Sequence, residues 1–174
     1  MGQSPRIVEL GSIAPVDNHG SRRKRRHLLG MSFQDLPKNW SEFPLSDPTL
    51  AADVVDLQIN VGDRRLGIFK ALLCDQEDRF LMTVDLNLPG RIQDVRPSSC
   101  SKLLEPVAIP LQDLPGGGAL VLALGRPGPA EWPAVDSEWA EAATQACRAV
   151  GVRLIGFYIA TTYQVRRAEV SAIA

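Results

Sequence analysis

Histidine is almost absent from this chain. Its two copies, His19 and His27, both lie in the first thirty of 174 residues. The rest of the sequence therefore offers no imidazole, the side chain that serves most often as a general base and as a nitrogen ligand for metals. Most metal sites and all histidine-based catalysis are excluded from residues 31–174. We expect no metal, no cofactor and no catalytic residue there, and the sequence favours a protein that is not an enzyme.

Cysteine is also scarce. Cys74, Cys100 and Cys147 are far apart, and none belongs to a Cys-x-x-Cys motif. An odd, scattered set argues against a disulfide framework or a zinc ribbon, and favours a reducing, cytoplasmic compartment. Cys74 and Cys147 fall in apolar segments and are expected to be buried structural residues. Cys100 lies in a Ser-rich segment and is the thiol that we expect to be exposed.

Long apolar runs are missing as well. No stretch of about 18 apolar residues occurs, so no membrane-spanning helix is expected. The hydrophobic fraction of 45% and the charged fraction of 22% lie in the ordinary globular range. A chain of this length can bury a substantial core, which predicts one folded domain over residues 31–174.

The formal net charge of −1 hides a basic leader. Residues 1–30 hold six Lys/Arg against two acids, whereas the remainder holds 13 against 18. The apolar stretch after the basic run, Leu28–Leu29, is too short for the core of a secretory signal. Because Met31 follows at once, residues 1–30 are interpreted either as a disordered basic arm or as a segment upstream of the true start. The cations of this arm are Arg22, Arg23, Lys24, Arg25 and Arg26.

The basic arm has two interpretations. Clustered cations displace counterions from nucleic acid, so this run could be a nucleic-acid-binding arm. No aromatic residue is interleaved with the cations to stack on bases. A solvated tail on an acidic protein is therefore the favoured interpretation, and nucleic acid is kept as an alternative partner.

The first half of the body predicts an extended lead-in followed by a β-hairpin. Three prolines within 36–48 prevent a regular helix there. Residues 49–57 fit either a short helix or the entry to a strand. Two apolar runs, 65–74 and 79–86, flank the polar residues 75–78 and are typical of a hairpin.

The second half predicts a strand–loop–helix–strand unit. A short helix over 98–105 is expected to stop at Pro106 and Pro110, before an apolar strand over 119–124 and a Pro/Gly loop over 125–133. A helix over 136–150, capped by Asp136 or Ser137, precedes a strand over 152–160. This is a βαβ unit if the strands are parallel. Residues 161–170 are expected to begin as a continuation of this strand and to finish as a short helix or a frayed end. Arg166–Arg167 are expected to face solvent.

This order of elements resembles the RadC-like branch of the JAB/MPN metalloprotease-like family. Leu122-Ala-Leu-Gly-Arg-Pro-Gly128 occupies the place of that family's His-x-His-Pro-Ser-Gly strand end, and Pro133-Ala-Val-Asp-Ser137 resembles its helix entry. Ala149-Val-Gly-Val-Arg-Leu-Ile155 is similar to the following strand entry. The resemblance covers roughly residues 65–160. It implies a single mixed α/β domain in the three-layer, cytidine-deaminase-like arrangement.

The metal ligands of that family are missing from this sequence. Its two histidines would fall on Leu124 and Arg126, which cannot hold zinc, and its serine position carries Ala134. Only Asp136 survives as a possible ligand. The resemblance therefore implies a vestigial, metal-free cleft, with Glu131 and Trp132 beside it. Arg126 could bind an anion or a peptide next to Trp132; alternatively, it forms a surface pair with Glu131 while Trp139 packs in the core.

Three functions follow from these observations. The first is a non-catalytic, JAB/MPN-like interaction or scaffold module that binds a protein partner or a second copy of itself. The second is a nucleic-acid-associated protein that uses the basic arm. The third is a small hydrolase with an unrecognised site at Asp136, Cys100 or Glu131.

Overall fold

The central feature of the fold is a five-stranded mixed sheet, seen in a computed structural model that describes residues 33–170. The strands are β1 (Ile68–Cys74), β2 (Phe80–Leu86), β3 (Ala119–Gly125), β4 (Arg153–Ala160) and β5 (Val165–Arg167). Their order is β2-β1-β3-β4-β5, and only β3 and β4 run parallel. The expected hairpin is β1–β2, and the expected βαβ unit is β3–α5–β4. The basic arm and Met31 lie outside the described residues.

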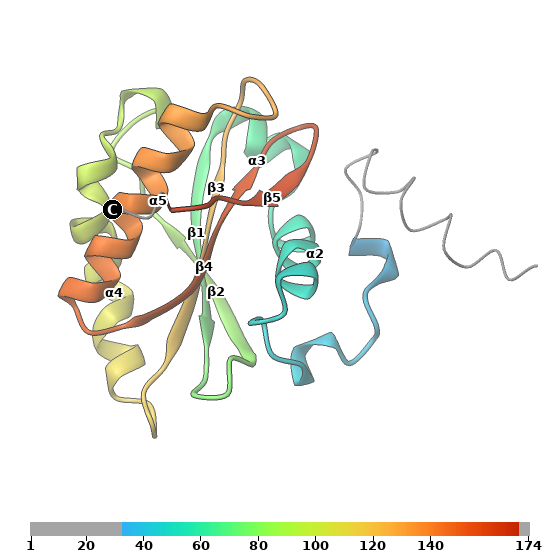
Figure 1. The fold of residues 1–174 in the computed structure, drawn as a ribbon, viewed down its shortest axis with the longest axis vertical. Helices are drawn as coiled ribbons and strands as arrows, with labels where there is room; N and C mark the ends of the chain where they lie inside the picture. Colours follow the sequence, from blue (N-terminus) through green and yellow to red (C-terminus); the bar gives the residue numbers. More distant parts are fainter. Residues whose placement is uncertain (1–32, 171–174) are drawn as a thin grey trace, which may run out of the picture.

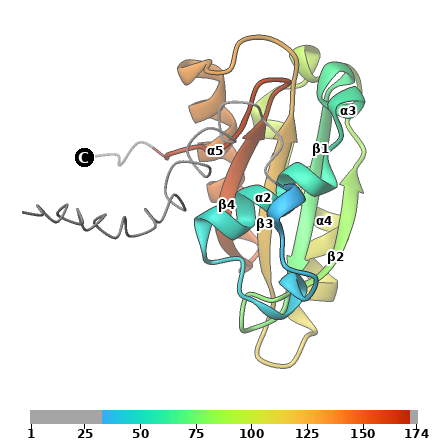
Figure 2. The same ribbon diagram turned by 90° about the vertical axis from the view of Figure 1, so that its right-hand side faces the viewer.

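Helices cover both faces of this sheet, which gives three layers (Figures 1 and 2). Helices α4 (Cys100–Gln112) and α5 (Pro133–Ala149) pack side by side on one face. Helix α2 (Pro48–Gln58) and the short α3 (Val61–Leu66) lie on the other. Four 3-10 turns complete the described part: Phe33–Asp35, Trp40–Glu42, Ile92–Asp94 and Pro97–Ser99. The structure is thus a single mixed α/β domain, as the sequence predicts.

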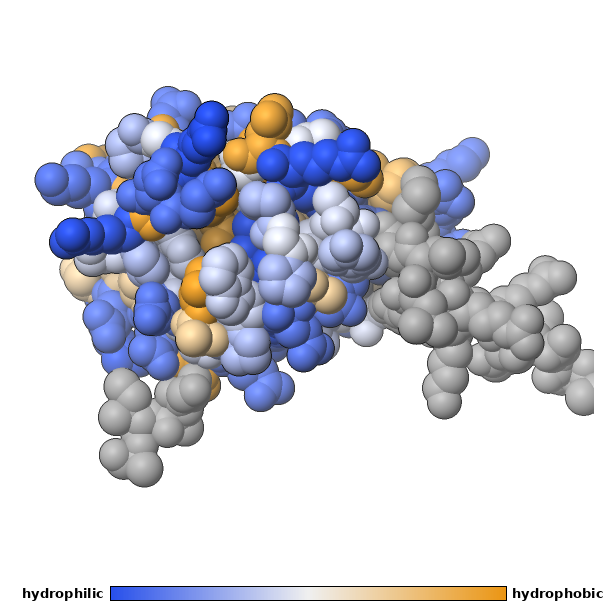
Figure 3. Space-filling model, turned by 90° about the horizontal axis from the view of Figure 1, so that it is seen from above, coloured by the Kyte–Doolittle hydropathy of each residue, from blue (hydrophilic) through white to orange (hydrophobic). Residues whose placement is uncertain are grey.

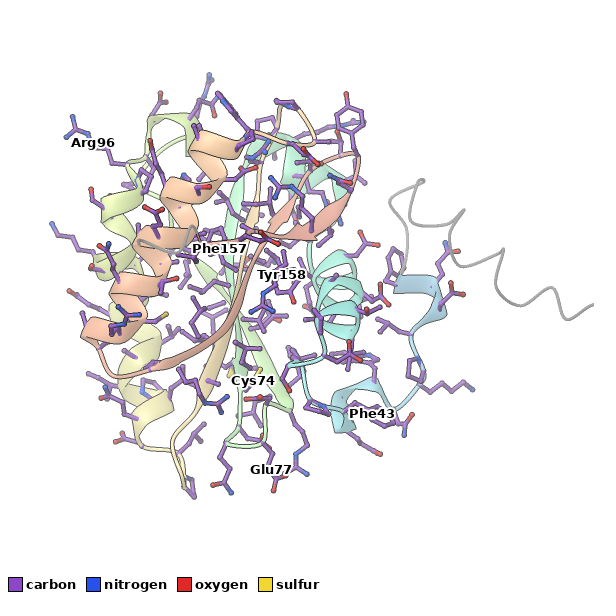
Figure 4. All side chains as sticks on the ribbon, viewed as in Figure 1. Phe43, Cys74, Glu77, Arg96, Phe157 and Tyr158 are labelled. Atoms are coloured by element: carbon purple, nitrogen blue, oxygen red, sulfur yellow. The ribbon has the colours of Figure 1, made fainter. Side chains whose placement is uncertain are left out.

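Each face of the sheet forms its own hydrophobic core. Successive residues of a strand point to opposite faces, so Phe157 lies on the α5 side and Tyr158 on the α2 side (Figure 4). Strand β3 is buried along its whole length because it contributes to both cores. This explains its uninterrupted apolar sequence, Ala119–Gly125.

Helix α4 corrects one expectation. The helix does not stop at its prolines but continues through Pro106 and Pro110 to Gln112. Both prolines lie on the exposed face of the helix. The carbonyls that lose a backbone donor there therefore lie on the side that water reaches. The opposite face is buried, so packing outweighs the proline penalty; its buried residues are Cys100, Leu104, Val107, Ala108 and Leu111.

The remaining boundaries differ in smaller ways. Residues 49–57 lie in helix α2. Asp47, just before this helix, caps it by accepting hydrogen bonds from the Thr49 and Leu50 amides. Helix α5 begins three residues before the expected cap, with Pro133 at its first position. Asp136 is therefore inside the first turn and does not cap the helix. Gly151 adopts the expected left-handed conformation after it, with φ of 69°. Within the described part of the chain, no helix has the length and apolarity needed to cross a membrane.

Candidate functional site at the carboxyl end of the parallel strands

The residues predicted to form the cleft gather where β3 and β4 end. The carboxyl ends of parallel strands meet at one edge of a sheet, which is where open α/β folds usually bind ligands. Here the Arg126 amide donates to the Ala160 carbonyl, which joins the two strand ends. Figure 3 views the molecule from this end, and most of the surface there is hydrophilic, with apolar residues scattered between.

Arg126 and Asp136 form a buried, bidentate ion pair. Arg126 Nε lies 2.7 Å from Asp136 Oδ1, and Arg126 Nη2 lies 2.7 Å from Asp136 Oδ2. Both side chains are at most 3% exposed. Parallel guanidinium–carboxylate bonds of this kind are stronger and more specific in geometry than hydrogen bonds between neutral groups. The charged groups at the cleft therefore neutralise each other.

The rest of the Arg126 guanidinium holds the loop between β3 and α5. Its Nη1 donates to the carbonyls of Pro127, at 3.2 Å, and Pro129, at 2.8 Å. Its Cζ lies 5.9 Å from the centre of the Trp132 ring, a cation–π distance. The Pro/Gly loop is thus fastened to one side chain.

Asp136 is likewise saturated with donors. Its Oδ2 also accepts the Trp132 amide, at 3.1 Å, and a short hydrogen bond from Arg166 Nη2. Arg166 is half-buried because of this contact, so the expectation that it faces solvent is wrong, whereas Arg167 is exposed as expected. One carboxylate thereby connects the loop after β3, the start of α5 and strand β5.

Of the other predicted cleft residues, Trp132 belongs to this network, whereas Leu124 and Glu131 do not. Leu124 is fully buried and, with Arg126 and Trp132, lines a cavity of about 50 Å³ next to the core residue Trp139. Glu131 is exposed, and the acid that pairs with Arg126 is Asp136, so the surface Arg126–Glu131 pair is wrong. Trp132 is 46% exposed.

A second buried ion pair on the α2 side was not predicted from the sequence. Arg64 Nη2 lies 2.5 Å from Asp56 Oδ1. The same guanidinium donates to the carbonyl of Ile59, at 2.9 Å, and to that of Thr161, at 3.1 Å, directly after β4. Because Asp56 and Arg64 lie on different helices, no local motif in the sequence pairs them. The two ion pairs secure opposite faces of the same sheet end.

The thiols offer no nucleophile. All three are buried, which corrects the expectation that Cys100 is exposed: Cys100 begins α4 and faces α5. Burial raises the pKa of each thiol to about 12, helped at Cys100 by the nearby Cys147 and at Cys74 by Asp78 and Asp75. Among residues 33–170, no three His, Cys, Asp or Glu side chains converge as a metal site would require.

A groove lies along the outer edge of β4, on the side away from β3. Strand β5 pairs with only three of the eight residues of β4, Tyr158–Ala160. The Ala168 amide adds one bond to the Phe157 carbonyl, at 2.8 Å, and the chain then turns to the α5 side, where Ala168 is buried. Figure 1 shows this last segment crossing β4 towards α5. In the described chain, residues 153–156 thus have no strand neighbour on this side.

This edge groove measures about 480 Å³. Its floor is the uncovered part of β4, its walls come from helix α5 and the segment after β5, and both polar and apolar side chains contribute. The lining residues are Thr144, Leu154, Ile155, Gly156, Phe157, Arg167, Ala168, Glu169 and Val170.

Comparison with known proteins returns no relative. The chain matches no protein-family model, no curated protein and no solved structure at a significant level. The resemblance to the RadC-like branch of the JAB/MPN family therefore stays a prediction, and the function is argued from the geometry alone.

Proposed function

We propose that this protein is a non-catalytic interaction module that binds an extended segment of another polypeptide along the uncovered edge of β4. The observation that carries the proposal is the groove beside residues 153–156, where half of β4 has no strand neighbour among the described residues on the side away from β3. A cytoplasmic location accompanies the proposal, because the three cysteines are free thiols.

The chemistry of an uncovered strand edge supports this function. A strand edge presents unpaired amides and carbonyls, and an extended peptide satisfies them by adding one more strand. Main-chain bonds then supply affinity, and pockets for alternate side chains supply specificity. The apolar side chains of Leu154, Phe157 and Val170 in the groove are suited to receive such side chains.

The closed state of the cleft supports the same function. A guanidinium that binds an anionic ligand needs free donors, but those of Arg126 are directed at Asp136 and two loop carbonyls. An external carboxylate would have to displace Asp136 from a site that is 2% exposed. We therefore assign the Arg126–Asp136 pair to the structure of the sheet end and not to ligand binding. A partner-binding role agrees with what the JAB/MPN resemblance implies for a member without its metal ligands.

Filling the groove tests the proposal. Thr144 stands on the α5 wall of the groove, so a Thr144→Trp substitution should block an incoming strand. Gln145, the next residue, is exposed and does not line the groove, which makes Gln145→Trp a matched control. The probe is a displayed library of random twelve-residue peptides, selected on the full-length protein.

We expect selected peptides to bind the wild type and Gln145→Trp equally, and Thr144→Trp about tenfold or more weakly, since the main-chain bonds would be lost. When a peptide binds, the NMR chemical shifts of the backbone amides should change most at Arg153–Phe157. The proposal is wrong if no peptide is enriched over an unrelated protein, or if the enriched peptides bind both tryptophan variants alike.

A further inference from the structure

The side chain of Arg167 lies along the open edge of β4. Its Nη2 donates to the carbonyl of Ile155, at 2.9 Å. Arg167 pairs opposite Tyr158, so its side chain leaves the sheet on the α2 side. The segment after it turns to the α5 side. Arg167 and this segment therefore flank the groove on opposite sides of the sheet.

Arg167 occupies a backbone acceptor on the open edge of β4. The pairs Tyr158↔Arg167 and Phe157–Ala168 end the regular pairing at this edge. Beyond them the register of β4 against β3 shifts, with Leu120 opposite Leu154 and Val121 opposite Gly156, so the strand is irregular at Ile155. The Ile155 carbonyl is taken by a guanidinium instead of a backbone amide. Charged side chains at a sheet edge prevent unselective pairing. The edge is thus protected until Arg167 moves.

Gly156 makes room for this arrangement. A Cβ at position 156 would lie 3.3 Å from Arg167 Nε and 2.9 Å from a ring carbon of Tyr158. Glycine inside a strand weakens it and commonly marks a close approach of another group. Here two groups approach, the Tyr158 ring most closely and then the Arg167 side chain.

The charges around the groove indicate what would move Arg167. Arg166 is bound to Asp136, and Arg153 to Asp78. Of the carboxylates in residues 33–170, none lies within ion-pair distance of Arg167, although the chain segment beside it contributes Glu169 to the groove. A neutral carbonyl is therefore the acceptor that holds this exposed cation. A carboxylate would bind it more strongly, because it adds the attraction between opposite charges and can accept two parallel guanidinium bonds.

We propose, on the basis of the function proposed above, that the partner is an acidic extended segment whose carboxylate draws the Arg167 guanidinium away from the Ile155 carbonyl. The same event pairs the partner's charge and frees the carbonyl for the partner's backbone amide. Arg167 thereby selects acidic strands and excludes basic or neutral ones. This selection rests on one residue, so a single substitution tests it.

Two synthetic peptides serve as probes, one alternating Thr-Glu-Val-Glu and its counterpart with Lys in place of Glu. Three full-length proteins are compared: the wild type, Arg167→Gln and Arg65→Gln. Arg167→Gln keeps a donor for the Ile155 carbonyl but loses the charge. Arg65 is an exposed arginine in α3, outside the groove, and is the control. Binding is measured by fluorescence anisotropy at low and high salt.

We expect the wild type and Arg65→Gln to bind the acidic peptide about tenfold more tightly than the basic one, and Arg167→Gln to lose this preference. The preference should shrink with added salt. The wild type could bind both peptides equally, and Thr144→Trp could weaken both. That result would overturn the selection of acidic peptides but would leave strand addition intact. A preference that persists in Arg167→Gln would overturn the role of this residue. Binding of neither peptide would contradict both proposals.

Discussion

Asp56 and Asp136 each neutralise a buried arginine at the same end of the sheet. Taking such charges out of water is costly, and the cost is recovered only when every donor and acceptor is satisfied. The arginines reach this condition by also donating to backbone carbonyls, those of Pro127 and Pro129 for Arg126 and those of Ile59 and Thr161 for Arg64. In each pair the arginine thus supplies the hydrogen bonds that water would otherwise make to these loop carbonyls.

Removing one partner of such a pair should be worse than removing both. We expect Asp136→Ala to lower the free energy of unfolding by about 3–5 kcal/mol, because Arg126 would remain as an uncompensated buried cation. A double variant, Arg126→Met with Asp136→Leu, should recover part of the loss, since it removes the buried Arg126 cation, although Arg166 still loses its carboxylate. Urea unfolding measures both.

The exposed Glu138 on the same helix provides the control. Glu138→Ala should change the unfolding free energy by about 0.5 kcal/mol or less, as is usual for surface substitutions. A double variant no more stable than Asp136→Ala would contradict the role given to the unpaired charge.

At the scale of single elements, helix α4 is held by packing against its intrinsic preference. Its two prolines lie four positions apart on the exposed face, while the other face packs into the core that α4 shares with α5 and the sheet. Proline disfavours a helix interior by about 3 kcal/mol relative to alanine. The buried side of α4 offsets this cost.

Pro106→Ala should therefore stabilise the protein. The substitution restores a backbone donor inside α4, and we expect a gain of about 1–3 kcal/mol in chemical denaturation. Pro48 is the matched control, because it is the first residue of α2, where no amide partner is required. Pro48→Ala should give no comparable gain. Equal effects of the two substitutions would show that helix position is not the cause.

Much of the order of elements could be predicted, because the hairpin, the buried β3 and helix α5 have strong local patterns. The unpredicted parts depend on contacts between distant segments. The serines beside Cys100 favour an exposed thiol, yet this thiol is buried in the core next to α5. The acid that pairs with Arg126 is Asp136, ten positions away, and not the nearer Glu131. The open edge of β4 depends on where the chain turns after Arg167, which no local pattern marks.

At the scale of the whole molecule, two cores share one sheet. Strand β3 belongs to both. If one core opens and β3 is displaced, the other core therefore loses the strand against which it packs. Cooperative unfolding follows from this shared layer. The three cysteines report on it conveniently, because Cys74 lies in the α2-side core whereas Cys100 and Cys147 lie in the α5-side core.

Thiol labelling along a urea gradient should give one midpoint for all three cysteines. In the native protein we expect little reaction, since burial excludes the reagent and a pKa of about 12 keeps each thiol protonated near neutral pH. Mass spectrometry of each labelled cysteine measures the midpoints. Labelling of Cys74 at a lower urea concentration would mean that the α2 layer opens separately, and rapid labelling of native Cys100 would contradict its burial.

The bond from Arg64 to the Thr161 carbonyl spans 97 positions of the chain. Because the chain is synthesised from its amino terminus, α2, α3 and the hairpin leave the ribosome before β4 does. During that interval Arg64 has no carbonyl of residue 161 to bind and keeps its water. Contacts of such high sequence separation require the closure of a long loop, which slows folding more than it lowers stability. This end of the sheet is thus completed only after β4 has been synthesised.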